Sequence, residues 1–532
     1  DTVERNPNRG FAFLRGNEIV DQLSYTRLLT SARDLACALE KRGIKPGDRA
    51  LLAFDPGLDF IRAFWGCICA GVLPVPAPPV QESRRDRTLR RLQRIADDCR
   101  PALTLNSTVL AELETKPDRW QRPPTQDIAF LQYTSGSTRR PSGVVVSQEN
   151  IRANLAMLRS FHGRHSPVVM VHWLPLYHDM GLIRGMLSPL ELGADCYLLD
   201  PQEFIQSPAS WLEATSRFQA TLTGAPNFGY QLAVEKAKPD PALDLSSLRI
   251  SFCSAEPIRD HTLAKFSEKF RPFGFKQEAL KPSYGLAEAT VAVSGEMGER
   301  YQVRKLSISA LRENRLESPR TEQDTKHLVS CGRPLGEVEV RIVEEGVDQP
   351  PDTLGEIWLR GPSIATRYWN SAPENDPFSS CLQTGEGPFL RTGDLGFLDP
   401  EGNLYLAGRQ KDVLVIRGRN FHPHDIEATL EEELPCLRRG CTIAFQLEEW
   451  VGVSCECRSG VPEDLTAEIR RVVGEEFGLA TGLIAVLPLG GSLKTSSGKP
   501  QRARTRKELL TETLRPLYQW RRPSLQMHPS DL

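Results

Sequence analysis

The 532-residue sequence contains 12 cysteines but no pair at the Cys-x-x-Cys spacing. Its closest pairs, Cys67/Cys69 and Cys455/Cys457, have no His or Cys partner at the spacing of a zinc site. Dispersed cysteines in a long chain are typical of reduced thiols, so we expect a cytoplasmic protein. A membrane-spanning helix is not expected either, because four prolines interrupt the longest uncharged stretch, residues 63–80.

The sequence also lacks an excess of one charge sign, with 66 Lys and Arg against 68 Asp and Glu and a net charge of −2. Near-neutrality argues against a nucleic-acid partner bound through phosphate contacts. The 40% of hydrophobic and 25% of charged residues exclude a disordered chain. There is no Walker phosphate loop, since Pro500 follows Gly498-Lys499 where such a loop needs Ser or Thr.

Helix and strand patterns alternate through the first half of the chain. Apolar residues from Leu28 to Leu39 recur at helical spacing, and Gly43 stands where that helix should end. Strand-like runs then alternate with helical ones, at residues 49–54, 127–133, 143–147, 168–173, 194–199, 220–223 and 248–254. This alternation predicts an α/β fold whose largely parallel sheet is covered on both faces.

The pattern changes near Val338 to short alternating strands, at residues 338–343, 355–360 and 404–407, which predicts a β-rich subdomain. The polar residues 308–326 predict a surface connection, and a domain boundary is expected near Lys411.

Hydroxyl side chains surround a glycine in residues 134–138, between two expected strands: Thr134, Ser135, Gly136, Ser137 and Thr138. A glycine lets amide N–H groups and hydroxyls converge on one anion, as in a phosphate site. Taken alone, such a run is more often a surface loop. Other motifs have to decide between the two interpretations.

Eight segments occur in one order along the chain: Ser135-Gly-Ser-Thr138, Trp173–Gly181, Gly224-Ala-Pro-Asn-Phe228, Ser254-Ala-Glu-Pro257, Tyr284-Gly-Leu-Ala-Glu288, Arg391-Thr-Gly-Asp394, Gly408-Arg409 and Ser497-Gly-Lys499. Together they closely resemble the adenylate-forming enzymes, a superfamily of acyl-CoA synthetases, luciferases and adenylation domains. Three of these segments, with Arg417-Gly-Arg-Asn420, look like fatty-acyl-AMP ligases in particular.

The resemblance implies a large N-terminal domain, residues 1–410, built of two α/β subdomains and a β-rich subdomain at about 335–408. A small mobile α+β domain, residues 411–532, would rotate about a hinge at Lys411. The implied reaction uses ATP and Mg²⁺ to convert a fatty acid to an acyl-adenylate with release of pyrophosphate. The acyl group then passes to the phosphopantetheine thiol of an acyl carrier protein or a polyketide-synthase carrier domain.

The resemblance also assigns site residues. Residues 134–138 would hold the phosphates, and Glu288 with Thr134 would hold Mg²⁺, which prefers hard oxygen ligands. Adenine would contact Ala255, Glu256, Tyr284, Gly285 and Leu286. Asp394 would accept hydrogen bonds from the ribose hydroxyls, and Arg409 would bind ribose or phosphate.

Lys499 is the residue expected to carry the adenylation step. An ammonium group between carboxylate and α-phosphate offsets their repulsion and the charge of the transition state. By position alone it would be one more lysine of a basic tail.

His178 is assigned a role near the acyl carboxylate, with Asn227 and Phe228 as further acyl-site residues. No Gly-x-Ser-x-Gly elbow makes His178 part of a hydrolase triad. His422 and His424 imitate a metal cluster, but a surface turn is the expectation there.

Two alternatives stay open: a fatty-acyl-CoA synthetase, and a weakly catalytic or non-catalytic protein that binds fatty acid or adenylate. The segment 369–389 sits where the ligases carry an insertion thought to disfavour coenzyme A, although it can also be a tolerated surface loop. Two departures from the family pattern are Ser142, where a phosphate-loop lysine is usual, and Ser254, whose side chain stands where backbone would approach adenine.

Overall fold

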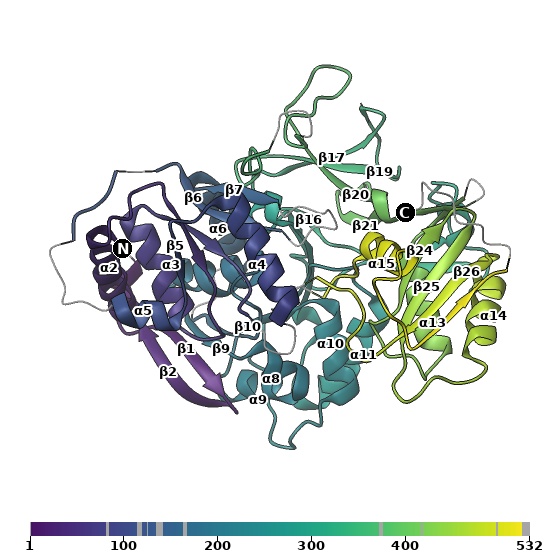
Figure 1. The fold of residues 1–532 in the computed structure, drawn as a ribbon, viewed down its shortest axis with the longest axis horizontal. Coiled ribbons are helices and arrows are strands. Elements are labelled where there is room, and N and C mark those ends of the chain that lie inside the picture. Colours follow the sequence, from purple (N-terminus) through teal and green to yellow (C-terminus); the bar gives the residue numbers. More distant parts are fainter. Residues whose placement is uncertain are drawn as a thin grey trace.

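The structure is a computed structural model. It describes residues 2–80, 85–113, 120–124, 126–134, 142–162, 167–371, 376–416, 419–495 and 498–523. In Figure 1 the N-terminal half lies on the left, the β-rich strands at the top and the C-terminal residues on the right.

The largest sheet has nine strands, in the order β16-β13-β12-β11-β10-β8-β9-β1-β2. Its strands are β1 (Gly10–Arg15), β2 (Glu18–Ser24), β8 (Val169–His172), β9 (Asp195–Leu198), β10 (Leu222–Ala225), β11 (Ile250–Cys253), β12 (Leu280–Tyr284), β13 (Ser294–Gly295) and β16 (Arg333–Pro334). The pairs from β12 through β1 are parallel, and antiparallel pairs occur toward the two edges. The largely parallel sheet predicted from the sequence is confirmed.

Helices cover both faces of this sheet. Successive strand residues point to opposite faces, and in strands such as β11 they are all buried. The helices are α6 (Gln148–His162), a π-helix η2 (Met180–Leu187), α7 (Ser188–Leu192), α8 (Pro201–Gln206), α9 (Ala209–Arg217), α10 (Asn227–Lys236), α11 (Asp260–Phe270) and the short η3 (Arg271–Phe273), η4 (Gln277–Ala279) and η5 (Ala287–Ala289). On one face, Tyr230 of α10 bonds Ser251 at 2.8 Å. On the other, Phe252 packs against Arg184 of η2 at 4.5 Å.

The N-terminal residues add a smaller layer. Its elements are α1 (Thr2–Arg5), α2 (Tyr25–Lys41), β3 (Arg49–Leu52), α3 (Asp59–Ala70), β4 (Leu73–Pro76), α4 (Arg85–Cys99), β5 (Leu103–Leu105), α5 (Ser107–Leu113), β6 (Ile128–Tyr133) and β7 (Gly143–Ser147). The predicted helix is α2, whose N-cap Ser24 accepts from the Arg27 amide. It ends as expected, because Gly43 adopts φ +79° just beyond it.

A second, antiparallel group of strands follows. One sheet has two strands, β14 (Val303–Ser307) and β15 (Thr325–Val329), with the short helix α12 (Ile308–Leu311) between them in sequence. The other has five strands: β17 (Glu339–Glu344), β18 (Val347–Asp348), β19 (Gly355–Arg360), β20 (Leu390–Leu398) and β21 (Leu404–Arg409). Part of the segment 369–389 packs on this sheet, where Leu382 and Phe389 form a buried cluster with Val343 and Trp358.

The remaining residues form a compact unit after the turn η7 (Gln410–Asp412). Its elements are β22 (Leu414–Ile416), β23 (Arg419–Phe421), α13 (Pro423–Glu433), β24 (Ile443–Leu447), β25 (Trp450–Glu456), α14 (Leu465–Phe477), β26 (Thr481–Leu487), α15 (Arg502–Leu510) and β27 (Tyr518–Arg521). We call residues 413–523 the C-terminal unit. It has buried clusters of its own, which include Ile426, Val453 and Ile484.

Residues 308–326 do more than connect two strands. The Arg312 guanidinium lies 4.7 Å from the ring of Phe421 in the C-terminal unit. The Lys326 ammonium lies 2.8 Å from the Asp425 carboxylate of the same unit. The expectation of a plain surface connection was therefore incomplete, because this segment contacts the C-terminal unit through Arg312 and Lys326.

The expectation of a surface turn at His422 and His424 was wrong. His422 is 8% exposed and precedes α13, whose buried Ile426 and Leu430 draw the start of the helix inward. Its ring lies so close to Gly408 that a Cβ there would come within 2.6 Å of Nδ1. Burial lowers the pKa of His422 to about 4, so the ring is neutral at physiological pH. Among the described residues, no group of three His, Cys, Asp or Glu is placed to hold a metal ion.

None of the helices in the described ranges is long and apolar enough to cross a membrane. None of the twelve cysteines is in a disulfide bond.

Candidate active site

The predicted site residues follow the carboxyl ends of parallel strands. His178 comes after β8, Asn227 after β10, Glu256 after β11 and Gly285 after β12. Because these strands run in one direction, their carboxyl ends lie along one edge of the sheet. Ligands of open α/β sheets bind at this edge.

The segment after β11 is held in an unusual conformation. Ala255 adopts φ +76°, which a residue with a side chain rarely does. Ser254 donates its hydroxyl to the Ser283 carbonyl at 2.9 Å and is 7% exposed. The Ser254 side chain therefore points toward the backbone of β12. Its effect on adenine binding stays a prediction.

Gly285 is required where it stands. A Cβ on this residue would lie 1.6 Å from the carbonyl oxygen of Val291. The chain after Tyr284 can thus fold back closely on the segment that leads to β13. Leu286 follows it and is half-buried.

Asp394 is clamped by two neighbours. The Tyr284 hydroxyl donates to one carboxylate oxygen at 2.6 Å, and Arg409 Nε donates to the other at 2.8 Å. Asp394 is 7% exposed, and its backbone N–H donates to the Thr392 hydroxyl at 3.0 Å. Burial raises the pKa of Tyr284 well above its usual value, and the Asp394 carboxylate adds to this shift. Tyr284 is therefore always a donor, which fixes the carboxylate.

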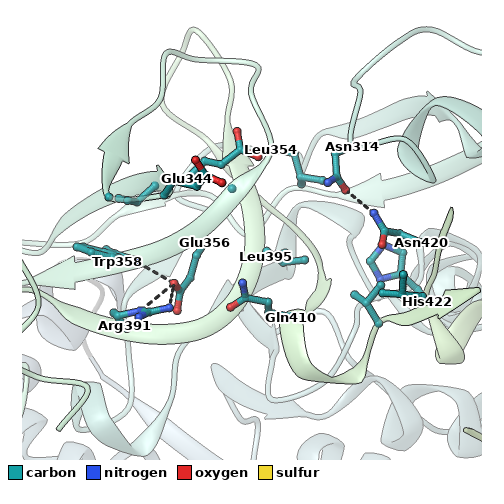
Figure 2. Close-up of a pocket in the computed structure, with 16 residues that line it drawn as sticks. Asn314, Glu344, Leu354, Glu356, Trp358, Arg391, Leu395, Gln410, Asn420 and His422 are labelled. Atoms are coloured by element: carbon teal, nitrogen blue, oxygen red, sulfur yellow. Dashed lines mark hydrogen bonds and ion pairs between the residues drawn. The ribbon is translucent and has the colours of Figure 1, made fainter. Parts of the chain in front are cut away.

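The part of β20 that carries Asp394 is bonded to a residue that sequence reasoning missed. The Glu356 carboxylate accepts from the Gly393 amide at 3.1 Å and from Arg391 Nε and the Trp358 indole at 3.0 Å each. Glu356, Trp358 and Arg391, labelled in Figure 2, line a cleft between the β-rich sheet and the C-terminal unit. The volume of this cleft is about 620 Å³. Glu356 gave no motif signal, because its role depends on a partner strand.

Glu288 is bonded by another residue that the motifs did not include. The Tyr368 hydroxyl donates to its carboxylate at 2.7 Å. Tyr368 also forms a β-bridge with Val144, at the start of the strand that follows the predicted phosphate loop. Tyr368 therefore links the loop's flank to Glu288.

The predicted phosphate loop is only partly described. Thr134 is half-buried, and its N–H donates to the Ser142 carbonyl at 3.1 Å, which closes the base of the loop. Ser135, Gly136, Ser137 and Thr138 lie outside the described residues.

The two residues predicted to hold Mg²⁺, Glu288 and Thr134, offer one carboxylate and one hydroxyl. Such a set fits Mg²⁺, which keeps waters and takes most of its ligands from substrate phosphates. It does not fit a metal held by protein ligands alone.

Lys499 approaches from the C-terminal unit. Its N–H donates to the Thr495 hydroxyl at 3.0 Å, and its carbonyl accepts from the Thr495 amide at 2.8 Å. Four charged side chains lie within electrostatic reach of its ammonium group: Arg409, Asp179, Asp394 and Glu256. Burial and then the Arg409 guanidinium lower the pKa of Lys499, against the effect of the three carboxylates. A residue near the end of the chain thus lies within electrostatic reach of two of the strand-end segments, after β8 and β11, and of Asp394 in β20.

His178 and Asp179 form a pair at the start of η2. Their side chains approach to 2.6 Å, and Asp179 also accepts from the Met180 amide at 2.6 Å. Burial alone would raise the pKa of Asp179, but His178 and Lys499 hold it below its ordinary value. The Asp179 carboxylate, at the start of η2, therefore attracts the Lys499 ammonium.

Asn227 and Phe228 start α10 and connect it to the neighbouring segment. The Asn227 side chain accepts from the Arg259 amide at 3.0 Å, and the Phe228 amide donates to the Glu256 carboxylate. The Phe228 ring meets Trp173 edge to face at 5.6 Å. Burial raises the pKa of Glu256, against the bond from Phe228.

Lys411 is exposed within η7, two residues after Arg409. Two residues further on, the chain enters the C-terminal unit.

This edge of a parallel sheet, with a basic residue supplied by a second unit, defines an adenylate-forming fold. The AMP-binding enzyme family matches residues 1–369. The medium-chain-fatty-acid–[acyl-carrier-protein] ligase JamA of Moorena producens (strain JHB) is 38% identical, over 96% of this chain and 94% of its own length. The long-chain-fatty-acid–AMP ligase FadD26 of Mycobacterium marinum is 32% identical, over 94% of this chain and 95% of its own.

Solved structures of fatty acyl-adenylate ligases have the same fold as this chain. A structure from a study of fatty acyl-adenylate ligases of E. coli and L. pneumophila has a TM-score of 0.88 at 32% identity, over 96% of this chain and 98% of the other. The L. pneumophila fatty acyl-adenylate ligase in complex with acyl adenylate and pyrophosphate has a TM-score of 0.74 at 34% identity, over 98% and 96%. The chain belongs to the AMP-binding enzyme family and, within it, to the fatty-acyl-AMP ligases.

Proposed function

We propose that this protein activates a fatty acid with ATP, releases pyrophosphate and transfers the acyl group from the acyl-adenylate to the thiol of an acyl carrier protein. The observation that carries the proposal is the position of Lys499, among Asp179, Glu256, Asp394 and Arg409. Family membership supplies the reaction class, and this juxtaposition supplies a cation where the two anionic reactants would meet.

In this proposal Lys499 donates hydrogen bonds to the fatty-acid carboxylate and the α-phosphate. The ammonium lowers the repulsion between the two anions and stabilises the charge that develops on the α-phosphate oxygens. The lowered pKa of Lys499 reflects a partly desolvated group, whose interactions with anions are stronger than in water. His178, oriented by Asp179, lies on the acyl side of Lys499 and orients the carboxylate.

The nucleotide contacts follow the same arrangement. Asp394, fixed by Tyr284, accepts from the ribose hydroxyls, and Arg409 neutralises phosphate or holds ribose. Adenine lies on the backbone around Ala255 and Gly285, where side chains are turned away or absent.

Residues 134–138 hold the phosphates, and Glu288 with Thr134 hold Mg²⁺. The magnesium ion, when bound, neutralises the departing pyrophosphate. Tyr368 donates to Glu288 and keeps its carboxylate in place. The cytoplasmic location stays a prediction.

We further propose that residues 1–410 and 411–532 are separate domains with a hinge at Lys411. The structure supports this division by the separate core of the C-terminal unit. Rotation would remove Lys499 after adenylation and admit the carrier thiol. The segment 369–389, packed on the β-rich sheet, remains the proposed reason for choosing a carrier over coenzyme A.

Pyrophosphate release with dodecanoic acid, wild type against Lys499→Ala, tests adenylation. We expect a loss of about 100-fold or more, because one transition-state donor is removed. Equal background in both proteins would instead support a non-catalytic binding protein. Incubation of the wild type with holo carrier protein or coenzyme A then tests the acceptor, and thioester formed with coenzyme A alone would favour a synthetase.

A further inference from the structure

A buried guanidinium without a carboxylate partner lies directly beneath the proposed active site. Arg184 belongs to η2, which begins at the His178–Asp179 pair, and it is only 2% exposed. Burial lowers its pKa to about 10, so it stays charged at neutral pH. An isolated charge in a protein interior costs several kcal/mol unless it is paired.

The contacts of Arg184 do not compensate that cost. Its guanidinium lies 4.5 Å from the ring of Phe252 and 5.5 Å from that of Phe161. Its Nη2 donates to the Ser283 hydroxyl over a long 3.5 Å, and Nη1 has no hydrogen-bond partner in the described part of the chain. Asp179 acts on it electrostatically but makes no ion pair with it among the described residues.

A second buried donor stands beside it. His162 is 3% exposed, and neither ring nitrogen has a hydrogen-bond partner in the part of the chain that the structure describes. Burial, and then the Arg184 charge, lower the pKa of His162 to about 3, so the ring is neutral and offers one N–H. Since buried polar groups are nearly always paired, a neighbouring guanidinium and imidazole with unused donors indicate a missing acceptor.

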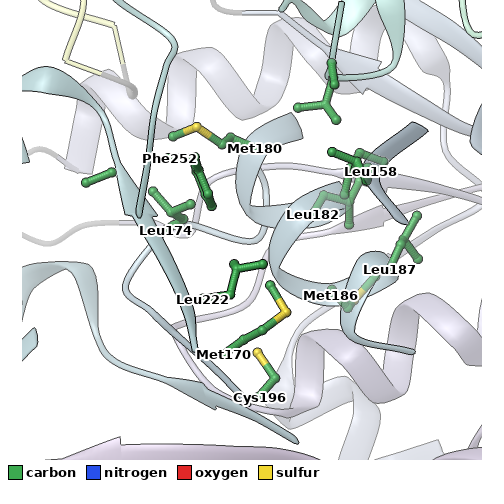
Figure 3. Packing of buried hydrophobic residues seen from close by; sticks show 14 of the residues in the cluster. Leu158, Met170, Leu174, Met180, Leu182, Met186, Leu187, Cys196, Leu222 and Phe252 are labelled. Atoms are coloured by element: carbon green, nitrogen blue, oxygen red, sulfur yellow. The ribbon is translucent and has the colours of Figure 1, made fainter. Parts of the chain in front are cut away.

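The position of Arg184 and His162 indicates that the missing acceptor belongs to the substrate. Phe252 lies two residues before Ser254, and Ser283 immediately precedes Tyr284. Arg184 therefore contacts the ends of β11 and β12, just before the segments proposed to bind the adenylate. The surroundings are otherwise apolar. Figure 3 shows Phe252 close to Met180 and Leu174, with Met186 and Met170 below them. Methionine side chains are flexible and can yield to an acyl chain.

We propose that Arg184, with His162, binds an anionic group on the acyl chain of the substrate, so that this ligase prefers fatty acids with a second carboxylate. A guanidinium pairs with carboxylate through two parallel hydrogen bonds, and Arg184 has the free donors to do so. The proposal rests on the proposed function, since it names the acid that the same site activates.

Competition between decanedioic and decanoic acid for acyl-adenylate formation, followed by mass spectrometry, tests it. We expect wild type to favour the diacid, and Arg184→Met to lower the ratio of diacid to monoacid product at least tenfold by removing the charge. Arg184→Lys should retain part of the preference. Leu187→Met, a change of similar volume on the same helix, should leave the ratio unchanged.

The melting temperature separates this role from a structural one. Replacing an unpaired buried charge by an apolar side chain of similar length is neutral or stabilising, so Arg184→Met should melt at or above the wild-type temperature. A wild-type ratio in Arg184→Met, or a lower melting temperature with the ratio kept, would overturn the proposal. Absence of adenylate from both acids in wild type would instead refute the proposed function itself.

Discussion

The ion pair between Lys326 and Asp425 joins the C-terminal unit to the rest of the chain in the orientation that brings Lys499 to the site. The Lys326 side chain is 12% exposed and that of Asp425 30%. Asp425→Asn keeps the shape but leaves the Lys326 charge without its carboxylate. Breaking one side of such a pair costs about 2 kcal/mol. This lowers the docked population relative to the undocked one by about 30-fold.

Single-turnover kinetics measure the effect on each half-reaction. We expect Asp425→Asn to slow acyl-adenylate formation by about threefold to thirtyfold, depending on how fully the wild type is docked. Transfer from preformed adenylate to the carrier should not slow, because it needs the other orientation. Asp352→Asn is the control, since the Asp352 carboxylate is about as exposed as that of Asp425 and its pair with Arg304 stays within the β-rich part.

Charge reversal completes this test. Lys326→Asp together with Asp425→Lys should restore much of the adenylation rate, whereas each single reversal should lower it. The reasoning is refuted if both half-reactions slow equally, or if Asp352→Asn gives the same loss.

Three further changes test other parts of the site. Tyr368→Phe removes the donor to Glu288 and should raise the Mg²⁺ concentration for half-maximal adenylation several-fold; an unchanged requirement would count against Glu288 as the ligand. Gly285→Ala places a Cβ 1.6 Å from the Val291 oxygen and should lower the unfolding free energy by about 3 kcal/mol in urea titration. His162 is buried and neutral with its pKa lowered to about 3, so the unfolded chain binds the proton first as the pH falls. Below about pH 6 this costs up to about 1.4 kcal/mol of stability per pH unit, and His162→Phe should reduce the slope by nearly one proton.

The strand-end motifs were readable because their function depends on local backbone. Residues after β11 and β12 must turn sharply beside a ligand, which demands small residues such as Ala255 and Gly285 at fixed positions. The same holds in β20, where Gly393 adopts φ +69° directly before Asp394. The sequence pattern located four strands of the main sheet, β8, β9, β10 and β11, but not β1, β2, β12, β13 or β16. The located strands are short, mostly apolar runs, as expected for strands buried on both faces.

Residues whose roles depend on distant partners were not readable. Four such residues contact segments that are far away in the sequence: Glu356, Tyr368, Arg312 and Lys326. Arg184 follows a recognised motif directly, but nothing in the sequence shows that its charge is buried without an acid. Burial and pairing are tertiary properties, and a one-dimensional pattern does not contain them.

The charges around Lys499 couple its docking to the nucleotide. With Lys499 in place, its ammonium and the Arg409 guanidinium stand near the carboxyl groups of Asp179, Asp394 and Glu256. Without it, one cation remains beside three acids, an unfavourable site for a triphosphate and a carboxylate. Docking therefore strengthens ATP binding, and by linkage ATP must strengthen docking by the same factor. A variant that weakens docking through Asp425 should thus bind ATP more weakly, although Asp425 itself lies away from the nucleotide site.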